Sequence, residues 1–303
     1  MLSRVAARNN GVMPELPDLR VLADAFTTAL AGRPLRATTI KEPLVVRGTQ
    51  SELRGFEGQR LERVTQRGKF LTLRLASGRI VINAMLTGRL GLAEPGSKPF
   101  TATALVLTFG PREVAPSSDT LAPWTVGADW VPYDAATVEL RYRDPKRMGK
   151  VYLLPDGIER EVAGWEGQGP DADDHMLDLA TWVARLRRHN GELGNLLKNQ
   201  ELVAGIGNAY SDEVLWAARI GPFRKRPSLA DEEAERLLTA MRETLAWASD
   251  EVRSRVPPRF EVQARDFLNV HLKGGQPCPR CGTTLSQVSP GGFVTTWCRS
   301  CQP

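Results

Sequence analysis

The strongest constraint on this 303-residue chain is a cluster of four cysteines within its last 26 residues. Cys278 and Cys281 form one C-x-x-C pair, and Cys298 and Cys301 form a second pair after sixteen intervening residues. Two such pairs place four thiolates at the corners of a tetrahedron, which is typical of a structural zinc site. Two disulfides or four free thiols are the alternative. A saturated four-sulfur site has no open position, so the predicted ion stabilises a small hairpin rather than catalysing a reaction.

Composition and charge narrow the class of protein. Hydrophobic residues make up 42% of the chain and charged residues 25%, which is ordinary for a globular protein. No apolar run is long enough to span a membrane, and no signal-peptide core follows the start, so we expect a cytoplasmic protein with no membrane partner. We also expect a monomer, associated with the nucleoid if it binds DNA. From residue 252 onward there are seven basic and two acidic residues. Clustered cations suit a nucleic-acid backbone, and a solvated basic surface is the alternative.

The first half of the chain is predicted to be rich in strands. An apolar stripe predicts one helix from about Pro17, ending at Gly32. Short alternating segments with a tight turn at Ser77-Gly78 favour a β-sandwich or barrel. The predicted strands cover residues 61–66, 70–76, 79–86, 102–109, 138–142 and 151–154. Residues 111–133 are rich in Pro, Ser and Asp, and we predict a long surface loop there.

The second half is predicted to be helical. Asp171 is the predicted cap of a helix over 171–189, and three further helices are expected at 192–199, at 208–218 and from Ser228 to about Arg253. A Gly205-Ile206-Gly207-Asn208 turn joins the second and third of these helices. Glycines permit positive φ there, and the amides at the start of the next helix are expected to face a phosphate. Asn208 is a candidate cap and side-chain donor.

Three segments together resemble one family. Residues 195–213 resemble the helix–two-turn–helix of the formamidopyrimidine-DNA glycosylase/endonuclease VIII (Fpg/Nei) family, residues 13–18 resemble its start, and the cysteine tail resembles its zinc finger. The resemblance implies an α+β multidomain protein. The implied parts are an N-terminal β-sandwich with flanking helices over 14–157, a helix–two-turn–helix domain over 170–258 and a zinc ribbon over 260–303. DNA is expected in the cleft between the first two.

The implied activity is that of a bifunctional DNA glycosylase and abasic-site lyase of base-excision repair, acting on damaged double-stranded DNA. Only an N-terminal proline offers a secondary amine that forms an iminium ion with a sugar carbon, which makes Pro14 the candidate nucleophile. Glu15 is the candidate general acid–base. An acylated nitrogen cannot attack, so residues 1–13 are interpreted as a leader or mis-assigned start that is absent from the mature protein. Both β- and β,δ-elimination are compatible with this chemistry.

The resemblance also implies DNA contacts. Lys69 matches the family's strand lysine, which contacts the phosphate flanking the lesion. Leu86 is the expected wedge into the space left by the flipped base. In the segment Asp144–Gly149, Lys146 and Met148 take the places of an arginine and an aromatic residue, and Arg147 between them is a further candidate. Asn208 completes the predicted DNA-binding set.

Two departures from the family pattern bear on the substrate. The zinc hairpin carries Phe293 where the family usually has an arginine, so that phosphate contact is missing or is supplied by Arg299 or Lys273. The stretch between the long helix and the zinc site is short, leaving little room for a loop that closes over oxidised purines. Both departures argue against a preference for 8-oxoguanine and favour a Nei-like or divergent substrate range.

The main alternative to an enzyme is a non-catalytic protein that binds damaged or abasic DNA. An RNA- or ribosome-associated protein is a weaker alternative, because it leaves the Pro-Glu start unexplained.

Overall fold

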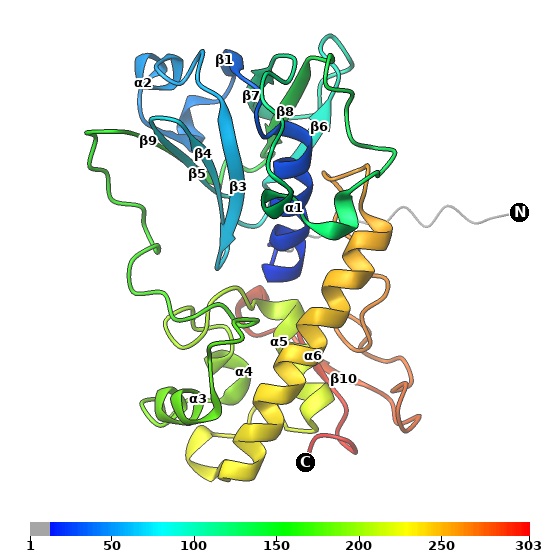
Figure 1. Cartoon of the computed structure of the whole chain (residues 1–303). Helices are drawn as coiled ribbons and strands as arrows, with labels where there is room; N and C mark the ends of the chain where they lie inside the picture. Colours follow the sequence, from blue (N-terminus) through cyan, green and yellow to red (C-terminus); the bar gives the residue numbers. More distant parts are fainter. Residues whose placement is uncertain (1–12) are drawn as a thin grey trace, which may run out of the picture.

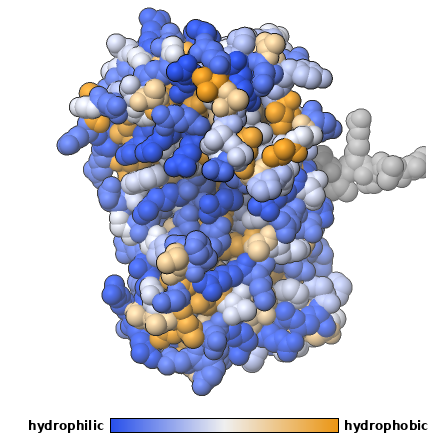
Figure 2. Space-filling model, in the orientation of Figure 1, coloured by the Kyte–Doolittle hydropathy of each residue, from blue (hydrophilic) through white to orange (hydrophobic). Residues whose placement is uncertain are grey.

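The computed structural model describes residues 13–303, so the segment 1–13 that is interpreted as a leader lies, except for Met13, outside the described residues. Figure 1 shows two parts, one built on β-sheets and one built on helices, with the long helix α6 (Asp231–Arg255) extending from the helical part to the side of α1 (Leu16–Leu30). Hydrophilic side chains cover most of the face in Figure 2, and apolar ones gather there only in small groups. No helix among residues 13–303 has the length and apolar character needed to cross a membrane.

The N-terminal part is a sandwich of two sheets. The four-stranded sheet has the order β1 (Leu35–Ile40), β7 (Thr103–Phe109), β8 (Val138–Arg143) and β6 (Arg89–Ala93). The five-stranded sheet has the order β2 (Val46–Arg47), β9 (Lys150–Pro155), β5 (Gly78–Asn83), β4 (Phe70–Leu75) and β3 (Leu61–Arg67). All neighbouring strands are antiparallel except β2 and β9. Side chains from both sheets and from α1 form one buried core, which also includes Val252, Val256 and Phe260 at the end of α6.

The six predicted strands are all present in the sandwich, and three further strands of the sandwich were not predicted. In β1, buried and exposed residues do not alternate regularly: Leu35 is buried, and the residues after it, including Arg36 and Thr38, are exposed or half-buried. β2 has two residues, and β6 contains a glycine. The short helix α2 (Gln50–Arg54) was also missed. Residues 111–133 form a long connection, as predicted, with two short turns of 3-10 helix at Ser118–Thr120 and Pro123–Thr125.

The helical part contains α3 (Leu179–Leu186), α4 (Leu193–Leu196), α5 (Asn208–Ala218) and α6. The prediction for α5 is confirmed at both ends. The prediction of a helix from Asp171 is wrong, because α3 begins at Leu179, where the Asp178 carboxylate caps it by accepting the amide of Thr181 at 2.7 Å. The Asp171 carboxylate instead accepts the backbone amide of Gly68 in the β3–β4 turn at 2.7 Å.

The C-terminal part is a small zinc ribbon. Strands β10 (Ser286–Val288) and β11 (Thr295–Trp297) pair antiparallel, and a short turn of 3-10 helix at Pro290–Gly292 lies in the loop between them. The buried cluster of this part consists of only Val270, Cys278, Leu285 and Cys298. So small a core is consistent with a hairpin whose stability depends on a metal. The predicted α+β fold class, with a sandwich, a helical part and a zinc ribbon, is thereby confirmed.

Candidate functional site

Glu15 connects the two large parts of the molecule. It precedes α1 and is 1% exposed. Its carboxylate accepts three backbone amides at the start of α5, from Gly207 at 2.6 Å, Ala209 at 2.9 Å and Tyr210 at 3.2 Å. A helix N-terminus presents unpaired amides and the positive end of its dipole, which favours an anion there. From the sequence, the amides at the start of α5 were expected to bind a phosphate. Three of them instead donate to the Glu15 carboxylate of the protein itself.

The two glycines of the turn permit this contact. Gly205 has a φ of +98°, and its carbonyl accepts the amide of Leu16 at 3.0 Å. A Cβ on Gly207 would lie 2.7 Å from the Glu15 carboxyl carbon, and a Cβ on Gly205 would lie 2.7 Å from the Leu16 Cβ. Real Cβ atoms do not approach other atoms so closely, so larger residues at either position would push Glu15 and α1 away from α5.

Lys69 comes to the same place from the β3–β4 turn. The turn is fixed against the helical part because Gly68, with a φ of +53°, donates its amide to Asp171. Burial lowers the pKa of the Lys69 ammonium, an effect that the negative charge of Glu15 opposes and the positive charge of Lys198 reinforces. Lys69 is thus a half-buried cation whose nearest charged groups belong to the site.

A cavity of about 830 Å³ brings these side chains together. Its lining includes Glu15, Lys69 and Asn208, which we call the floor. Met13 also lines the cavity, whereas Pro14, the next residue in the chain, is buried. The Met13 carbonyl accepts a hydrogen bond from the Gln263 side chain at 3.1 Å. Met13 thus reaches the cavity that holds the floor, whereas Pro14 lines a separate small cavity that Gln263 also lines.

Two cavity residues, Lys198 and His271, were missed by sequence reasoning. The Lys198 ammonium donates to the Asn208 side-chain oxygen at 3.2 Å, so the floor contains a second lysine. Lys198 lies within residues 195–213, the segment that resembles the family's helix–two-turn–helix, and this position could have identified it as a site residue. His271 lies in the irregular segment after α6, where a lone histidine gives no pattern to follow.

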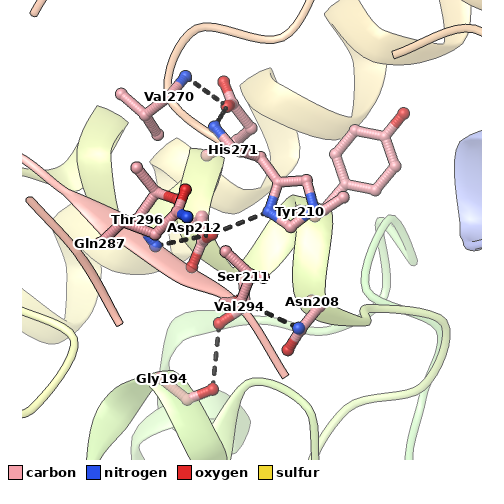
Figure 3. A network of polar contacts seen from close by, with 12 residues as sticks. Gly194, Asn208, Tyr210, Ser211, Asp212, Val270, His271, Gln287, Val294 and Thr296 are labelled. Atoms are coloured by element: carbon pink, nitrogen blue, oxygen red, sulfur yellow. Dashed lines mark hydrogen bonds and ion pairs between the residues drawn. The ribbon is translucent and has the colours of Figure 1, made fainter. Parts of the chain in front are cut away.

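A network of polar contacts fixes the zinc hairpin and the segment after α6 to α5 (Figure 3). The Asp212 carboxylate accepts the amide of Thr296 at 3.0 Å and lies 2.8 Å from Nδ1 of His271. Burial raises the pKa of Asp212 to about 6, and the contact with His271 opposes that rise. The Asn208 amide group donates to the Val294 carbonyl at 2.9 Å. The floor and the hairpin thus share one rigid support.

The segment after α6 is also held close to α1. Arg265 donates to the Asp18 carboxylate at 2.8 Å, and its guanidinium lies 5.3 Å from the centre of the Tyr210 ring. Asp18 accepts the Glu15 amide at 2.8 Å as well. These contacts hold the short connecting stretch against the site instead of leaving it as a long free loop.

Leu86, Lys146 and Met148, which we call the rim, lie on two neighbouring loops. Asp144 joins the loops because its carboxylate accepts the Thr87 hydroxyl and the Gly149 amide. Leu86 lines the cavity, whereas Lys146 and Met148 are not among its lining residues. Lys146 is exposed and Met148 half-buried. Arg147, between them, has a φ of +56° and pairs with Glu42 at 2.7 Å.

Lys273 and Arg299 were the two candidates to replace the family's hairpin arginine, and neither reaches the cavity. The Lys273 ammonium donates to the carbonyl of Leu268, and the Arg299 guanidinium lies 5.9 Å from the centre of the Trp297 ring. Neither residue lines the cavity, whereas Phe293 does and is 59% exposed.

The four cysteines form a group suited to one zinc ion. All four sulfur atoms lie within 4.8 Å of one another. Tetrahedral zinc with bonds of about 2.3 Å requires sulfur atoms about 3.8 Å apart, so this group fits the ion. The Trp216 indole donates to the Cys278 sulfur at 3.4 Å, as expected for an outer contact to a thiolate.

Comparison with known proteins agrees with this arrangement. The N-terminal domain of formamidopyrimidine-DNA glycosylase matches residues 13–151, the H2TH domain of that enzyme matches residues 168–255, and a zinc finger found in FPG and IleRS matches residues 275–303. The chain is 33% identical to a formamidopyrimidine-DNA glycosylase of Thermomicrobium roseum over 96% of this chain and 99% of that protein.

Solved structures show the same fold. The MutM (Fpg) protein of Thermus thermophilus is 28% identical, with a TM-score of 0.75 over 95% of this chain and 98% of that one. A Lactococcus lactis Fpg in complex with DNA that contains an abasic site is 22% identical, with a TM-score of 0.78 over 95% and 99% of the two chains. The chain therefore belongs to the formamidopyrimidine-DNA glycosylase family of base-excision repair enzymes.

Proposed function

We propose that this protein removes oxidised bases from double-stranded DNA and then cleaves the strand at the resulting abasic site, with the Pro14 nitrogen as nucleophile. One observation carries the proposal: Glu15, Lys69 and Asn208 converge in a single cavity that Met13, the residue before Pro14, also lines. The working enzyme in this proposal begins at Pro14. We further propose that it acts as a monomer in the cytoplasm. Binding without turnover is disfavoured, because a non-catalytic protein has no need of this arrangement.

The first step in the proposal is attack by the free amine. The Pro14 lone pair forms a bond to C1′ of the damaged nucleotide, and the bond from C1′ to the base breaks with its electron pair leaving on the base. The proton lost by the Pro14 nitrogen balances the proton that the departing base gains. Opening of the C1′–O4′ bond then gives an iminium ion, with a proton delivered to O4′.

Glu15 is the proposed proton carrier. Its carboxylate is held on one side by the amides of α5 and lines the cavity on the other, so it can move a proton at O4′ without moving itself. The iminium acidifies the C2′ proton, and its removal expels the 3′ phosphate by β-elimination. Loss of the 5′ phosphate by a second elimination, with the conjugated iminium as electron acceptor, is the proposed next step. Hydrolysis of the iminium by water then releases the sugar remnant and returns the free amine.

Binding of the DNA backbone is assigned to the cations of the site. Lys69 and Lys198 place positive charge next to Glu15, where a phosphate flanking the sugar must lie. Asn208 is the proposed side-chain donor beside them. Leu86, Lys146, Arg147 and Met148 are proposed to enter the duplex next to the flipped nucleotide. In this proposal residues 14–157 and 170–258 form the two walls of the DNA cleft, and 260–303 supply the hairpin.

Zinc has a structural part in the protein. When bound, the ion links Cys278, Cys281, Cys298 and Cys301 and so stabilises a hairpin with little core. Phe293 and Val294 are on that hairpin, and both line the cavity. In this proposal the four thiolates do not contact DNA; they position the hairpin residues that line the cavity.

Borohydride trapping on an abasic duplex tests the proposal. Protein that begins at Pro14 should give a covalent protein–DNA adduct, because borohydride reduces the iminium to a stable amine. Protein that retains Met13 serves as the matched control, since the same nitrogen is then an amide; it should give no adduct, and Pro14→Gly should weaken or abolish trapping. Equal cleavage of the duplex by the acylated and the free protein would refute the mechanism.

A further inference from the structure

The cavity has two kinds of wall. The floor is polar and charged, with Glu15, Lys69 and Asn208. Another part of the lining comes from the zinc hairpin and the segment before it, and two of the side chains there are large and apolar. Phe293 is 59% exposed and Leu272 is 45% exposed, and both line the cavity. Exposed apolar side chains that line one cavity together, rather than lying singly on the surface, suggest a place for an apolar part of the ligand.

The hairpin holds Phe293 at this place without covering its ring. The next residue, Val294, is fixed through its carbonyl to Asn208, and Thr296 is fixed to Asp212, as Figure 3 shows. On the other side, Gly291 and Gly292 have φ values of +60° and +84° and no atoms within 4 Å of a built Cβ. Within residues 13–303, no aromatic ring stacks on Phe293.

Among residues 271–303, no lysine or arginine lines the cavity, and the one titratable side chain that does is His271, whose Nδ1 lies 2.8 Å from the Asp212 carboxylate. The basic residues from Lys273 to the end of the chain are Lys273, Arg280 and Arg299. Lys273 bonds the carbonyl of Leu268, while Arg280 lies 4.0 Å from the Trp216 ring centre and Arg299 lies over Trp297. None of the three lines the cavity. None of these three cations is therefore placed to bind a phosphate on the Phe293 side of the cavity.

We propose that Phe293 and Leu272 form an apolar platform for the nucleobase of the nucleotide whose sugar lies at Glu15. Every base has a flat π-face, and aromatic side chains in nucleic-acid sites stack on that face with little regard to sequence. Enzymes that rotate a nucleotide out of the duplex hold its base between aromatic and apolar side chains. The platform and the floor line one cavity, so a nucleotide whose sugar lies at Glu15 can bring its base to Phe293.

This inference rests on the proposed function and adds a consequence of its own. A platform for the base matters only while a base is present. Recognition and excision of a damaged base should depend on Phe293, whereas reaction with a site that has already lost its base should not. A residue that merely filled the duplex or supported the hairpin would affect both substrates alike.

The experiment uses the full protein beginning at Pro14 and two duplexes of one sequence. One duplex carries a formamidopyrimidine base, and the other carries an abasic site at the same position. Phe293→Ala should lower binding and single-turnover excision of the base-containing duplex by about 5- to 150-fold, the range for loss of one stacked base. Borohydride trapping on the abasic duplex should change less than about twofold. Phe293→Trp should retain both activities, and Phe293→Leu should lie between.

Phe223→Ala is the matched control. Phe223 is also exposed, at 43%, but it packs on Trp297 and does not line the cavity. Equal losses on the two duplexes, or no loss on the base-containing one, would overturn the platform. Failure of the unaltered protein to form an adduct on the abasic duplex would instead overturn the proposed function, so the two failures are distinguishable.

Discussion

The floor of the cavity and its rim differ in how they are held. Glu15 and Lys69 are fixed by backbone contacts between the sheet part and the helical part, and Glu15 is 1% exposed. Leu86, Lys146 and Met148 of the rim are half-buried or exposed, on loops that one carboxylate, Asp144, joins. Groups that move protons need fixed positions, whereas groups that enter a duplex can adjust to it. Substitutions in the floor should therefore cost far more than substitutions in the rim.

Removing the charge of Glu15 should have the largest effect. Glu15→Gln keeps the shape of the side chain and an oxygen that accepts amides of α5, but it cannot accept and return a proton. We expect base excision to fall by about 10²- to 10⁴-fold, the usual range for a general acid–base. Single-turnover excision is the measurement, with circular dichroism to show that the variant is folded. A loss of less than tenfold in a folded variant would assign proton transfer to another group.

Lys69 should set the alkaline limit of activity. Because burial lowers its pKa, its charge is present below the lowered value and is lost as pH rises through it, earlier than for an ordinary lysine near 10.4. Lys69→Gln should lower kcat/KM for abasic duplex about 10- to 150-fold at neutral pH, which corresponds to one charge-assisted hydrogen bond.

The conservative variant separates charge from support. Lys69→Arg stays protonated at every accessible pH, so its trapping rate should persist at alkaline pH where that of the unaltered protein declines. The acidic side of both profiles should coincide, because Lys69 is already charged there. Coincident alkaline sides would show that Lys69 does not set the limit.

The rim should give the smallest effect. Leu86→Ala should change stability by only about 0.5 kcal/mol, as for most partly exposed positions, and should slow excision a few-fold. Leu16→Ala, at the buried first residue of α1 that packs against the Gly205 turn next to Glu15, should by contrast cost about 2–5 kcal/mol of unfolding free energy. Thermal unfolding of the two variants makes the comparison. Equal losses of stability would mean that the rim is as firmly built as the core that supports Glu15.

Much of the molecule follows from local patterns in the sequence. The cysteine spacing predicts the metal group, the apolar stripe predicts α1, and the Gly-x-Gly-Asn turn predicts the start of α5, because each depends on residues close together in the chain. The six alternating segments predict strands for the same reason. The prediction of a helix that begins at Asp171 was wrong. This aspartate looks like a helix cap, but its carboxylate accepts the amide of Gly68, 103 residues away in the chain.

Only the tertiary structure decided how the site is assembled. The Glu15 carboxylate meets the Gly207 amide across 192 residues, a pairing that no local pattern contains. His271 joins the cavity through a segment that carries no distinctive spacing, and Phe293 lines it because Asn208 and Asp212 hold the hairpin there. The sequence alone determined the kinds of chemical group available, since these depend on residue type and near neighbours. Which of them face one cavity depended on packing between distant segments, which the chain settles only when it folds.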